Sequence, residues 1–254
     1  MTPPDRVLQV TVERGVARLT MDSPANRNAL SRAMLAQLGA AVADAVADDA
    51  VRVLVLDHTG RVFCSGMDLS EAAGAGAGDQ GVHAFPELLT ALWSSPKPVI
   101  AAVRGPARAG GIGLMAVCDV VVGGASATFA VSEVRVGLVP AVISAVLAPR
   151  MARHLLHRLA LTGEVFGPEL AATAGLVDLA VADDAVDATV RAQVDALAAG
   201  APAALAETKR LLRSGGPRGS FDELQELSAR WFASEEGQEG IAAFREKRPA
   251  RWVP

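Results

Sequence analysis

Two strongly apolar runs of the chain each lead directly into a segment rich in glycine. Val51–Leu56 precedes Gly60–Leu69 (GRVFCSGMDL), and Val99–Val103 precedes Gly105–Gly113 (GPARAGGIG). Short apolar runs of this kind are typical of buried β-strands. Glycine at a strand exit lets the backbone approach a ligand and direct free N–H groups at it. If the two loops lie side by side, two N–H groups can bind one oxygen atom, whereas tight packing turns are the alternative interpretation.

The composition indicates a well-packed chain without a nucleic-acid or membrane function. Hydrophobic residues make up 51% of the 254 residues and charged residues 20%, which permits a sizeable core. The net charge of −4 argues against a nucleic-acid-binding protein, which needs a clustered basic surface. No apolar run approaches the roughly 18 residues that span a bilayer, and the N-terminal residues lack the apolar core of a signal peptide. We therefore expect a cytoplasmic protein.

Strand-like and helix-like segments alternate through the first half of the chain. Val7–Val12 and Val16–Met21 predict a hairpin that turns at Arg14-Gly15, and Ser31 is placed to cap a helix running to about Ala47. Later segments have helical patterns, over Ala145–Leu161, Pro168–Ala174, Asp184–Ala199, Pro202–Arg213 and Phe221–Ala233. This order predicts an α/β core over residues 1–195 and a helical C-terminal region over residues 196–254.

Several reactive side chains lack the partners that their usual chemistry needs. Cys64 and Cys118 have no metal-ligand spacing and form no disulfide framework, so we expect reduced thiols. His154 and His157 lie three residues apart without a nearby carboxylate, which favours structural roles. Ser65 lacks the G-x-S-x-G sequence of a serine hydrolase. We therefore expect neither a metal site nor a nucleophilic serine.

Short motifs follow one another in a characteristic order along nearly the whole chain. They are Pro24–Leu30 (PANRNAL), Arg61–Leu69, Ala109–Gly113 with Cys118-Asp119, Glu133, Gly137–Pro140, Leu161–Glu164, Gly175–Asp178 and Ser234–Arg248. Each motif alone is weakly specific, but their joint order resembles the crotonase (enoyl-CoA hydratase/isomerase) superfamily. The stretch Ser132–Ser144 resembles the bacterial methylglutaconyl-CoA-type hydratases in particular.

The resemblance implies a fold, an assembly and a class of substrate. We expect an α/β structure built as a β-β-α superhelix, with two nearly perpendicular sheets and a helical C-terminal region that forms trimers. The chain is then a homotrimer or a hexamer made of two trimers. Its substrate is an acyl thioester of coenzyme A (CoA), as in fatty acid metabolism, so CoA is part of the substrate and no separate cofactor is needed.

The resemblance also assigns roles to individual residues. The backbone N–H groups of Met67 and Gly110 are expected to hold the thioester oxygen, while Glu133 transfers the proton. Phe244 and Lys247 are expected to reach the CoA of a neighbouring subunit. The full set of implied CoA-binding positions is Arg27, Met67, Asp68, Leu69, Ser70, Phe244 and Lys247.

One of the two glutamates that many hydratases of this superfamily use is missing. Glu133 matches the second position, whereas Gly113 stands at the first, and glycine transfers no proton. A Gly-Leu pair such as Gly113-Leu114 also occurs in the methylglutaconyl-CoA-type subgroup. The leading interpretation is therefore a 2-enoyl-CoA hydratase, a hydro-lyase, in which Glu133 alone activates water. The alternatives are a Δ3-Δ2 enoyl-CoA isomerase and a non-catalytic subunit that binds CoA thioesters.

Overall fold

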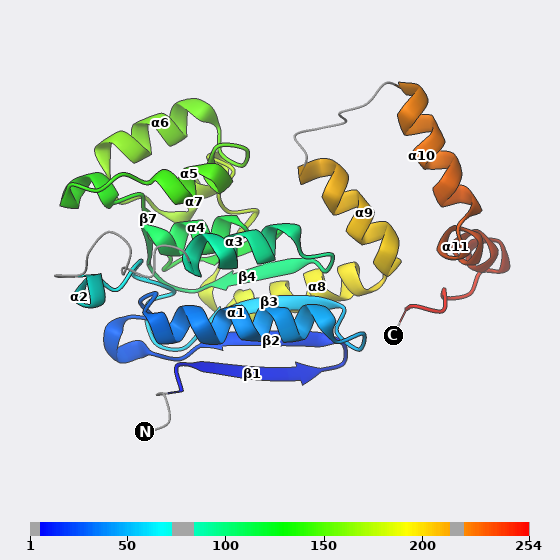
Figure 1. Ribbon diagram of the computed structural model, residues 1–254, viewed down its shortest axis with the longest axis horizontal. Coiled ribbons are helices and arrows are strands. Elements are labelled where there is room, and N and C mark those ends of the chain that lie inside the picture. Colours follow the sequence, from blue (N-terminus) through cyan, green and yellow to red (C-terminus); the bar gives the residue numbers. More distant parts are fainter. Residues whose placement is uncertain (1–5, 73–83, 214–220, 254) are drawn as a thin grey trace.

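The chain folds around a mixed β-sheet with helices on both faces, as the computed structural model shows for residues 6–72, 84–213 and 221–253 (Figure 1). The strands of this sheet, in spatial order, are β1 (Leu8–Glu13), β2 (Val16–Met21), β3 (Val53–His58), β4 (Val99–Val103), β6 (Val120–Gly124) and β8 (Leu179–Val181). β1 pairs antiparallel with β2, and all later neighbours pair in parallel. A second, parallel sheet contains β5 (Ala107–Arg108) and β7 (Phe129–Ala130).

Helices fill the connections between these strands and form the C-terminal part of the chain. They are η1 (Pro24–Asn26), α1 (Arg32–Ala47), α2 (Leu69–Ala72), α3 (Ala84–Ser94), α4 (Gly110–Ala116), η2 (Glu133–Val136), α5 (Ala141–Leu147), α6 (Arg153–Thr162), α7 (Pro168–Thr173), η3 (Asp183–Ala185), α8 (Val186–Ala198), α9 (Pro202–Arg213), α10 (Phe221–Ala233) and α11 (Glu235–Glu246). No helix within the described ranges is long and apolar enough to cross a bilayer.

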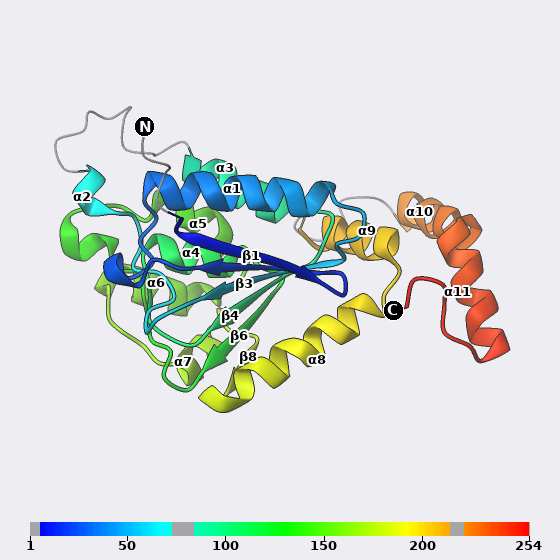
Figure 2. The ribbon, with the colours of Figure 1, turned by 90° about the horizontal axis from the view of Figure 1, so that it is seen from below.

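The central strands are mostly apolar because they are buried on both sides, and in β3 only the last two residues, Asp57 and His58, are polar. Leu54 and Leu56 of β3 pack into the larger core beneath α1, α3 and α4. Their neighbour Val55 faces the opposite side, where Val186 and Val190 of α8 cover the sheet (Figure 2). This alternation in β3 is the two-residue period of a strand, and it places α4 and α8 on opposite faces.

Several predicted elements are confirmed at the level of single contacts. Arg14 and Gly15 have φ angles of 50° and 77°, as a tight hairpin turn requires. The Ser31 hydroxyl accepts a hydrogen bond from the Met34 N–H at 3.2 Å, and the helix that it caps ends at Ala47. The α/β class and the helical C-terminal region are likewise confirmed.

Two helix predictions are wrong or incomplete. The helix predicted over Ala145–Leu161 is two helices, because α5 ends at Leu147 and α6 begins at Arg153. Pro149 lies in the break, where it has no N–H to continue the helical hydrogen bonds. The sequence analysis did not predict α11, although Ser234 caps it by accepting the Gly237 N–H at 3.0 Å.

The C-terminal helices α9, α10 and α11 lie beyond one end of the sheet (Figure 1). Helix α8 packs on the sheet and continues to Ala198, so the boundary predicted at residue 195 falls within its last turn. The division into a core and a C-terminal region otherwise remains a prediction.

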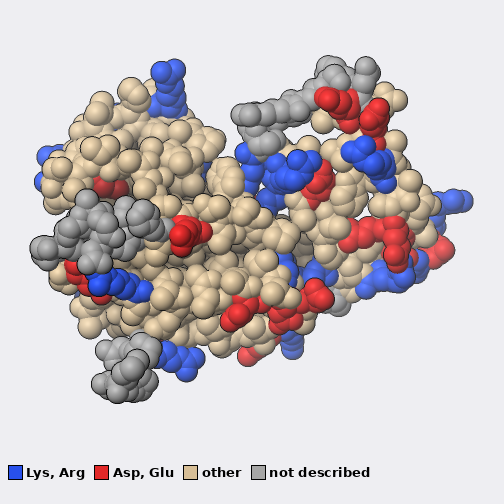
Figure 3. Space-filling model, viewed as in Figure 1, with Lys and Arg blue, Asp and Glu red and all other residues tan. Residues whose placement is uncertain are grey.

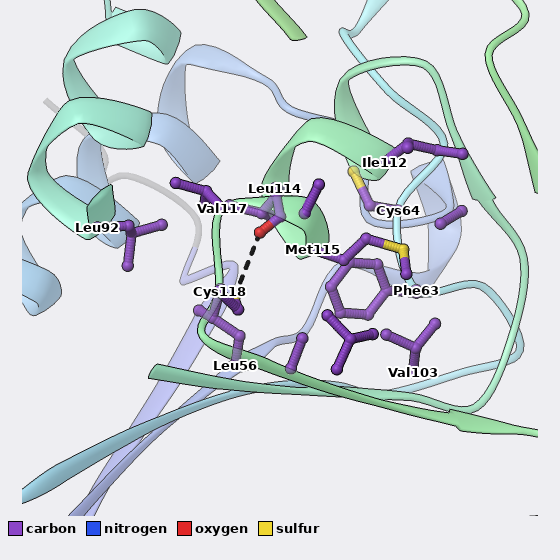
Figure 4. Close-up of a cluster of buried hydrophobic side chains, with 14 of the residues drawn as sticks. Leu56, Phe63, Cys64, Leu92, Val103, Ile112, Leu114, Met115, Val117 and Cys118 are labelled. Carbon is purple, nitrogen blue, oxygen red and sulfur yellow. Dashed lines mark hydrogen bonds between the residues drawn. The ribbon is translucent and has the colours of Figure 1, made fainter. Parts of the chain in front are cut away.

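Both glycine-rich loops rest on one cluster of buried side chains (Figure 4). Phe63 and Cys64 come from the first loop, and Ile112 comes from α4, and all three are fully buried. Burial raises the pKa of the Cys64 and Cys118 thiols to about 12, and both cysteines are free. Both thiols therefore act as small apolar side chains, and Cys64 packs where the first loop meets Gly111 of the second.

Gly111→Ala tests the contact between the two loops. A methyl group on Gly111 would lie 2.6 Å from the Cys64 carbonyl oxygen, so the loops would have to separate. We expect the free energy of unfolding to fall by about 1–3 kcal/mol. Gly39→Ala in α1 is the matched control, because no atom lies within 4 Å of its Cβ position, and it should add up to about 1 kcal/mol. Chemical denaturation measures both, and an unchanged stability of Gly111→Ala would contradict the contact.

Candidate active site

The first glycine-rich loop runs alongside the segment that follows η1. The Leu30 N–H donates to the Gly66 carbonyl at 2.8 Å, and the Asp68 N–H donates to the Leu30 carbonyl at 3.4 Å. These two bonds form a parallel bridge between Leu30 and Met67. In a parallel bridge both bonds on one strand come from the residues that flank the bridge residue, here Gly66 and Asp68. The bridge residue between them directs its own N–H away from the partner strand. The Met67 N–H therefore points away from Leu30.

The second glycine-rich loop lies on that other side. The Arg108 N–H donates to the Cys64 carbonyl at 3.0 Å, which makes β5 the neighbour of the first loop. β5 ends at Arg108, and α4 begins at Gly110. A Cβ atom on Gly66 would lie 3.5 Å from the Gly110 nitrogen, so Gly110 lies beside the residue that precedes Met67. We refer to the space between Met67 and Gly110 as the gap.

The turn at Ala109 joins β5 to α4 through an unusual backbone conformation. Ala109 has φ 47° and ψ −120°, a conformation that costs a residue other than glycine about 1–3 kcal/mol. The Ala109 N–H is held by the Ala130 carbonyl at 3.0 Å. Gly110 is the first residue of α4, so its N–H has no partner inside the helix. Within the described residues, neither the Gly110 N–H nor the Met67 N–H forms a hydrogen bond.

Glu133 follows β7 and begins η2, three residues after the strand end that holds the Gly110 turn. The bond from Ala109 to Ala130 fixes the end of β7 beside the Gly110 turn, and the three residues that lead on to Glu133 span at most about 10 Å. One carboxylate oxygen of Glu133, Oε2, is buried and has no hydrogen-bond partner in the part of the chain that the structure describes. Burial raises the pKa of the Glu133 carboxyl, and a bond from its own backbone N–H opposes this only in part. Such a carboxylate is suited to accept a proton.

The structure also shows what occupies the place of the missing first glutamate. A Cβ atom on Gly113 would lie 2.4 Å from Ile143 Cγ2 and 3.5 Å from the Phe85 ring. Ile143 and Phe85 are both buried, so a carboxylate at position 113 has no room unless α5 moves. The sequence analysis missed both residues, since an apolar side chain in a helix gives no chemical signal of its position.

The residues beside Met67 form a short turn at the edge of the site. Asp68 Oδ1 accepts hydrogen bonds from the Ser70 N–H at 3.0 Å and from the Ser70 hydroxyl. The Ser70 hydroxyl bond is the main reason why the pKa of Asp68 is lowered. Leu69 is 54% exposed, and the Arg27 carbonyl accepts the Ser65 N–H at 3.1 Å. The backbone of Arg27 therefore lies beside the first loop, at Ser65, and the CoA-binding role of Arg27 and residues 67–70 stays a prediction.

Phe244 and Lys247 lie elsewhere in the single chain. Both are on or just after α11, which is remote from α2 and α4 (Figure 1). Phe244 is 86% exposed, and Lys247 has no ion pair among the described residues. One chain alone does not bring these two residues to the gap between Met67 and Gly110.

Comparisons with known proteins identify the family. The family model for enoyl-CoA hydratase/isomerase matches residues 11–253. A probable enoyl-CoA hydratase of Rhodobacter capsulatus is 36% identical over 254 residues, covering 97% of each chain. The 2,3-dehydroadipyl-CoA hydratase of Escherichia coli is 32% identical over 245 residues, covering 95% of this chain and 96% of that protein. The crystal structure of an enoyl-CoA hydratase from Shewanella pealeana has a TM-score of 0.91 at 31% identity, covering 97% of this chain and 96% of that one. The chain therefore belongs to the enoyl-CoA hydratase/isomerase family, which its motifs resemble.

Proposed function

We propose that this protein is an enoyl-CoA hydratase that adds water to a 2-enoyl-CoA thioester and uses Glu133 as its only catalytic carboxylate. One observation carries the proposal: the Met67 and Gly110 N–H groups form no hydrogen bond among the described residues and belong to adjacent loops, and the strand that holds the Gly110 turn leads to the half-buried Glu133, whose Oε2 has no hydrogen-bond partner there. Two such donors suit a thioester oxygen that becomes negative during the reaction.

The reaction begins when the thioester oxygen accepts hydrogen bonds from the Met67 and Gly110 N–H groups. These bonds draw electrons from the conjugated double bond and make Cβ electrophilic. The Glu133 carboxylate takes a proton from water as the water oxygen bonds to Cβ. The electron pair of the double bond moves onto the thioester oxygen, and the two N–H groups stabilise this enolate. Each donor of this kind is typically worth about 3–4 kcal/mol in the transition state.

The second step returns the proton and restores the thioester. The enolate collapses, Cα takes the proton from the Glu133 carboxylic acid, and Glu133 becomes a carboxylate again. The hydroxyl and the hydrogen thus arrive from one side of the substrate, since one residue handles both. Ile143 and Phe85 fill the space beside Gly113, so water approaches from the side of Glu133.

The CoA part of the substrate lies along Arg27 and residues 67–70, and its nucleotide end meets Phe244 and Lys247 of a neighbouring subunit. The exposure of Phe244 supports this arrangement, as does the absence of an ion pair at Lys247 among the residues that the structure describes. Charged side chains gather over α9–α11, whereas the surface over α5 and α6 is mostly uncharged (Figure 3). Val139 and Leu161 are 78% and 73% exposed there, as expected of a surface that contacts another subunit.

Glu133→Gln tests the proposed mechanism directly. The amide has nearly the shape of the carboxylate, so we expect unchanged binding of CoA thioesters and a loss of turnover of about 10²–10⁴-fold. The assay follows the absorbance of the conjugated thioester with 2-enoyl-, 3-enoyl- and methylglutaconyl-CoA. Hydration removes this absorbance, whereas isomerisation of a 3-enoyl thioester creates it. If the unmodified protein only increases the absorbance of 3-enoyl-CoA and leaves that of 2-enoyl-CoA unchanged, the result would favour an isomerase. Near-native hydration by Glu133→Gln would overturn the mechanism.

The pH dependence of the reaction should report the raised pKa of Glu133. Glu133 must be ionised to accept a proton from water, so kcat/KM for hydration should fall as the pH drops through this pKa. Because burial raises the pKa above its ordinary value of 4.5, the fall should begin at a higher pH than for an exposed glutamate. A kcat/KM that stays constant down to pH values below the ordinary one would contradict this assignment.

The assembly is tested by light scattering of the purified protein at micromolar concentration. We expect the mass of a trimer or of a hexamer made of two trimers, because the site needs Phe244 and Lys247 from a second chain. A stable monomer with full hydratase activity would show that one chain suffices.

A further inference from the structure

The junction between α8 and α9 is a meeting point of three separate parts of the chain. Arg52, which directly precedes β3, donates from one guanidinium nitrogen to the Ala198 and Gly200 carbonyls at 3.3 and 2.8 Å. Its other terminal nitrogen donates to the Trp252 carbonyl at 2.8 Å. The Arg52 N–H itself donates to the Gly15 carbonyl at 2.7 Å. The β1–β2 hairpin, the end of α8 and the C-terminal residues are thereby fixed to one residue, the hairpin by its backbone N–H and the other two by its side chain.

Arg52 binds carbonyl oxygens at a helix end. Within the described residues it forms no ion pair with a carboxylate. The carbonyls just past the last turn of α8 carry the partial negative charge of a helix C-terminus, which favours a cation there. Arg52 therefore acts as a cross-link between backbone segments that lie far apart in the sequence.

Trp252 joins the same junction to α11. Its indole N–H donates to the Ala199 carbonyl at 3.0 Å, and the edge of its ring lies 3.3 Å from the Cβ position of Gly240. Figure 2 shows the chain end returning beside the end of α8. A single side chain thus touches the α8–α9 junction on one side and the middle of α11 on the other.

Further contacts make α11 and the C-terminal residues one unit. The Glu236 carboxylate, in the first turn of α11, accepts the first free N–H groups of α9, those of Ala203 and Ala204, at 3.1 and 3.0 Å. Glu239 accepts from the Arg248 guanidinium at 2.7 Å and from the Arg251 N–H at 2.9 Å. Helix α11 is consequently attached at its start through Glu236, and along its length through Trp252.

We infer that Arg52 and Trp252 form a latch that sets the position of α11 and so presents Phe244 and Lys247 to the nucleotide end of a CoA thioester in the neighbouring subunit. The inference rests on the proposed function, because it assigns these two residues to CoA binding. Arg52 and Trp252 are positioning residues and touch no substrate. Their effect is on where α11 stands, while the Met67 and Gly110 loops are held by strands on the far side of the molecule (Figure 1).

The test compares two substrates that differ only in the nucleotide. Steady-state kinetics are measured with crotonyl-CoA and with the crotonyl thioester of pantetheine, which lacks the nucleotide end. For Arg52→Ala and Trp252→Ala we expect KM for crotonyl-CoA to rise about 5- to 30-fold, with kcat within about twofold. The kinetics with the pantetheine thioester should stay unchanged. Trp252→Phe keeps the ring against Gly240 but loses the N–H, so its effect should be intermediate.

Lys97→Ala is the matched control. The Lys97 ammonium also binds carbonyl oxygens at a helix end, those of Ala45 and Asp48 at 2.8 and 2.6 Å, but it touches neither α11 nor the C-terminal residues. It should cost stability and leave the preference for CoA over pantetheine unchanged. Circular dichroism and light scattering check that each variant folds and assembles.

Lys247→Ala separates the latch from the proposed function. If Lys247→Ala loses the preference for CoA while Arg52→Ala and Trp252→Ala keep it, the latch is wrong and the CoA assignment stands. An equal rise in KM for both substrates in the latch variants would mean a general disturbance and would also overturn the latch. Absence of turnover by the unmodified protein would instead refute the proposed function.

Discussion

The site depends on the contact between the backbones of the two glycine-rich loops. The first loop lies between residues 27–30 and β5 and is bonded to both, through the Leu30–Met67 and Cys64–Ala107 bridges. A side chain at either of two glycines of the second loop would force the loops apart. A Cβ atom on Gly105 would lie 2.1 Å from the Arg61 carbonyl oxygen, and one on Gly111 would lie 2.6 Å from the Cys64 carbonyl oxygen. Because the proposed donors are backbone N–H groups, the proposed role of position 67 does not depend on its side chain, whereas the contact between the loops does depend on these glycines.

The electrostatic setting of Glu133 differs from that of the other carboxylates close to the core. Asp57 is paired with Arg18 and Arg104, and Asp119 lies between Lys209 and Arg213, at 2.8 and 2.6 Å. A buried carboxylate without such partners costs free energy. Among the described residues Glu133 Oε2 carries this cost without a hydrogen bond, and a group kept in that state is a candidate for proton transfer.

Local sequence signals predicted a large part of the fold and of the candidate site. The β4 run is apolar at every position because both of its faces are buried, and Ser31 marks a helix start through its own hydroxyl. Contacts between distant segments had no such signal. Ile143 fills the space beside Gly113, and Arg52 binds Trp252 across 200 residues. Neither contact can be predicted from the residues that are neighbours in the sequence. Pro149, by contrast, was a local signal of the break between α5 and α6 that the helical pattern around it obscured.

The distance between α11 and the two loops separates binding from chemistry within each chain. A contact with the nucleotide end of CoA is the same in the ground state and in the transition state, because no bond changes there. It therefore strengthens binding of substrate without altering the step at Cβ. In the proposed mechanism the N–H groups of Met67 and Gly110, by contrast, meet an oxygen whose charge grows during the reaction, so their placement would act on kcat. A pair of loops held on strands and a separately attached helix suit these two demands, since a change at the attachment of α11 leaves the backbone bonds of the two loops in place.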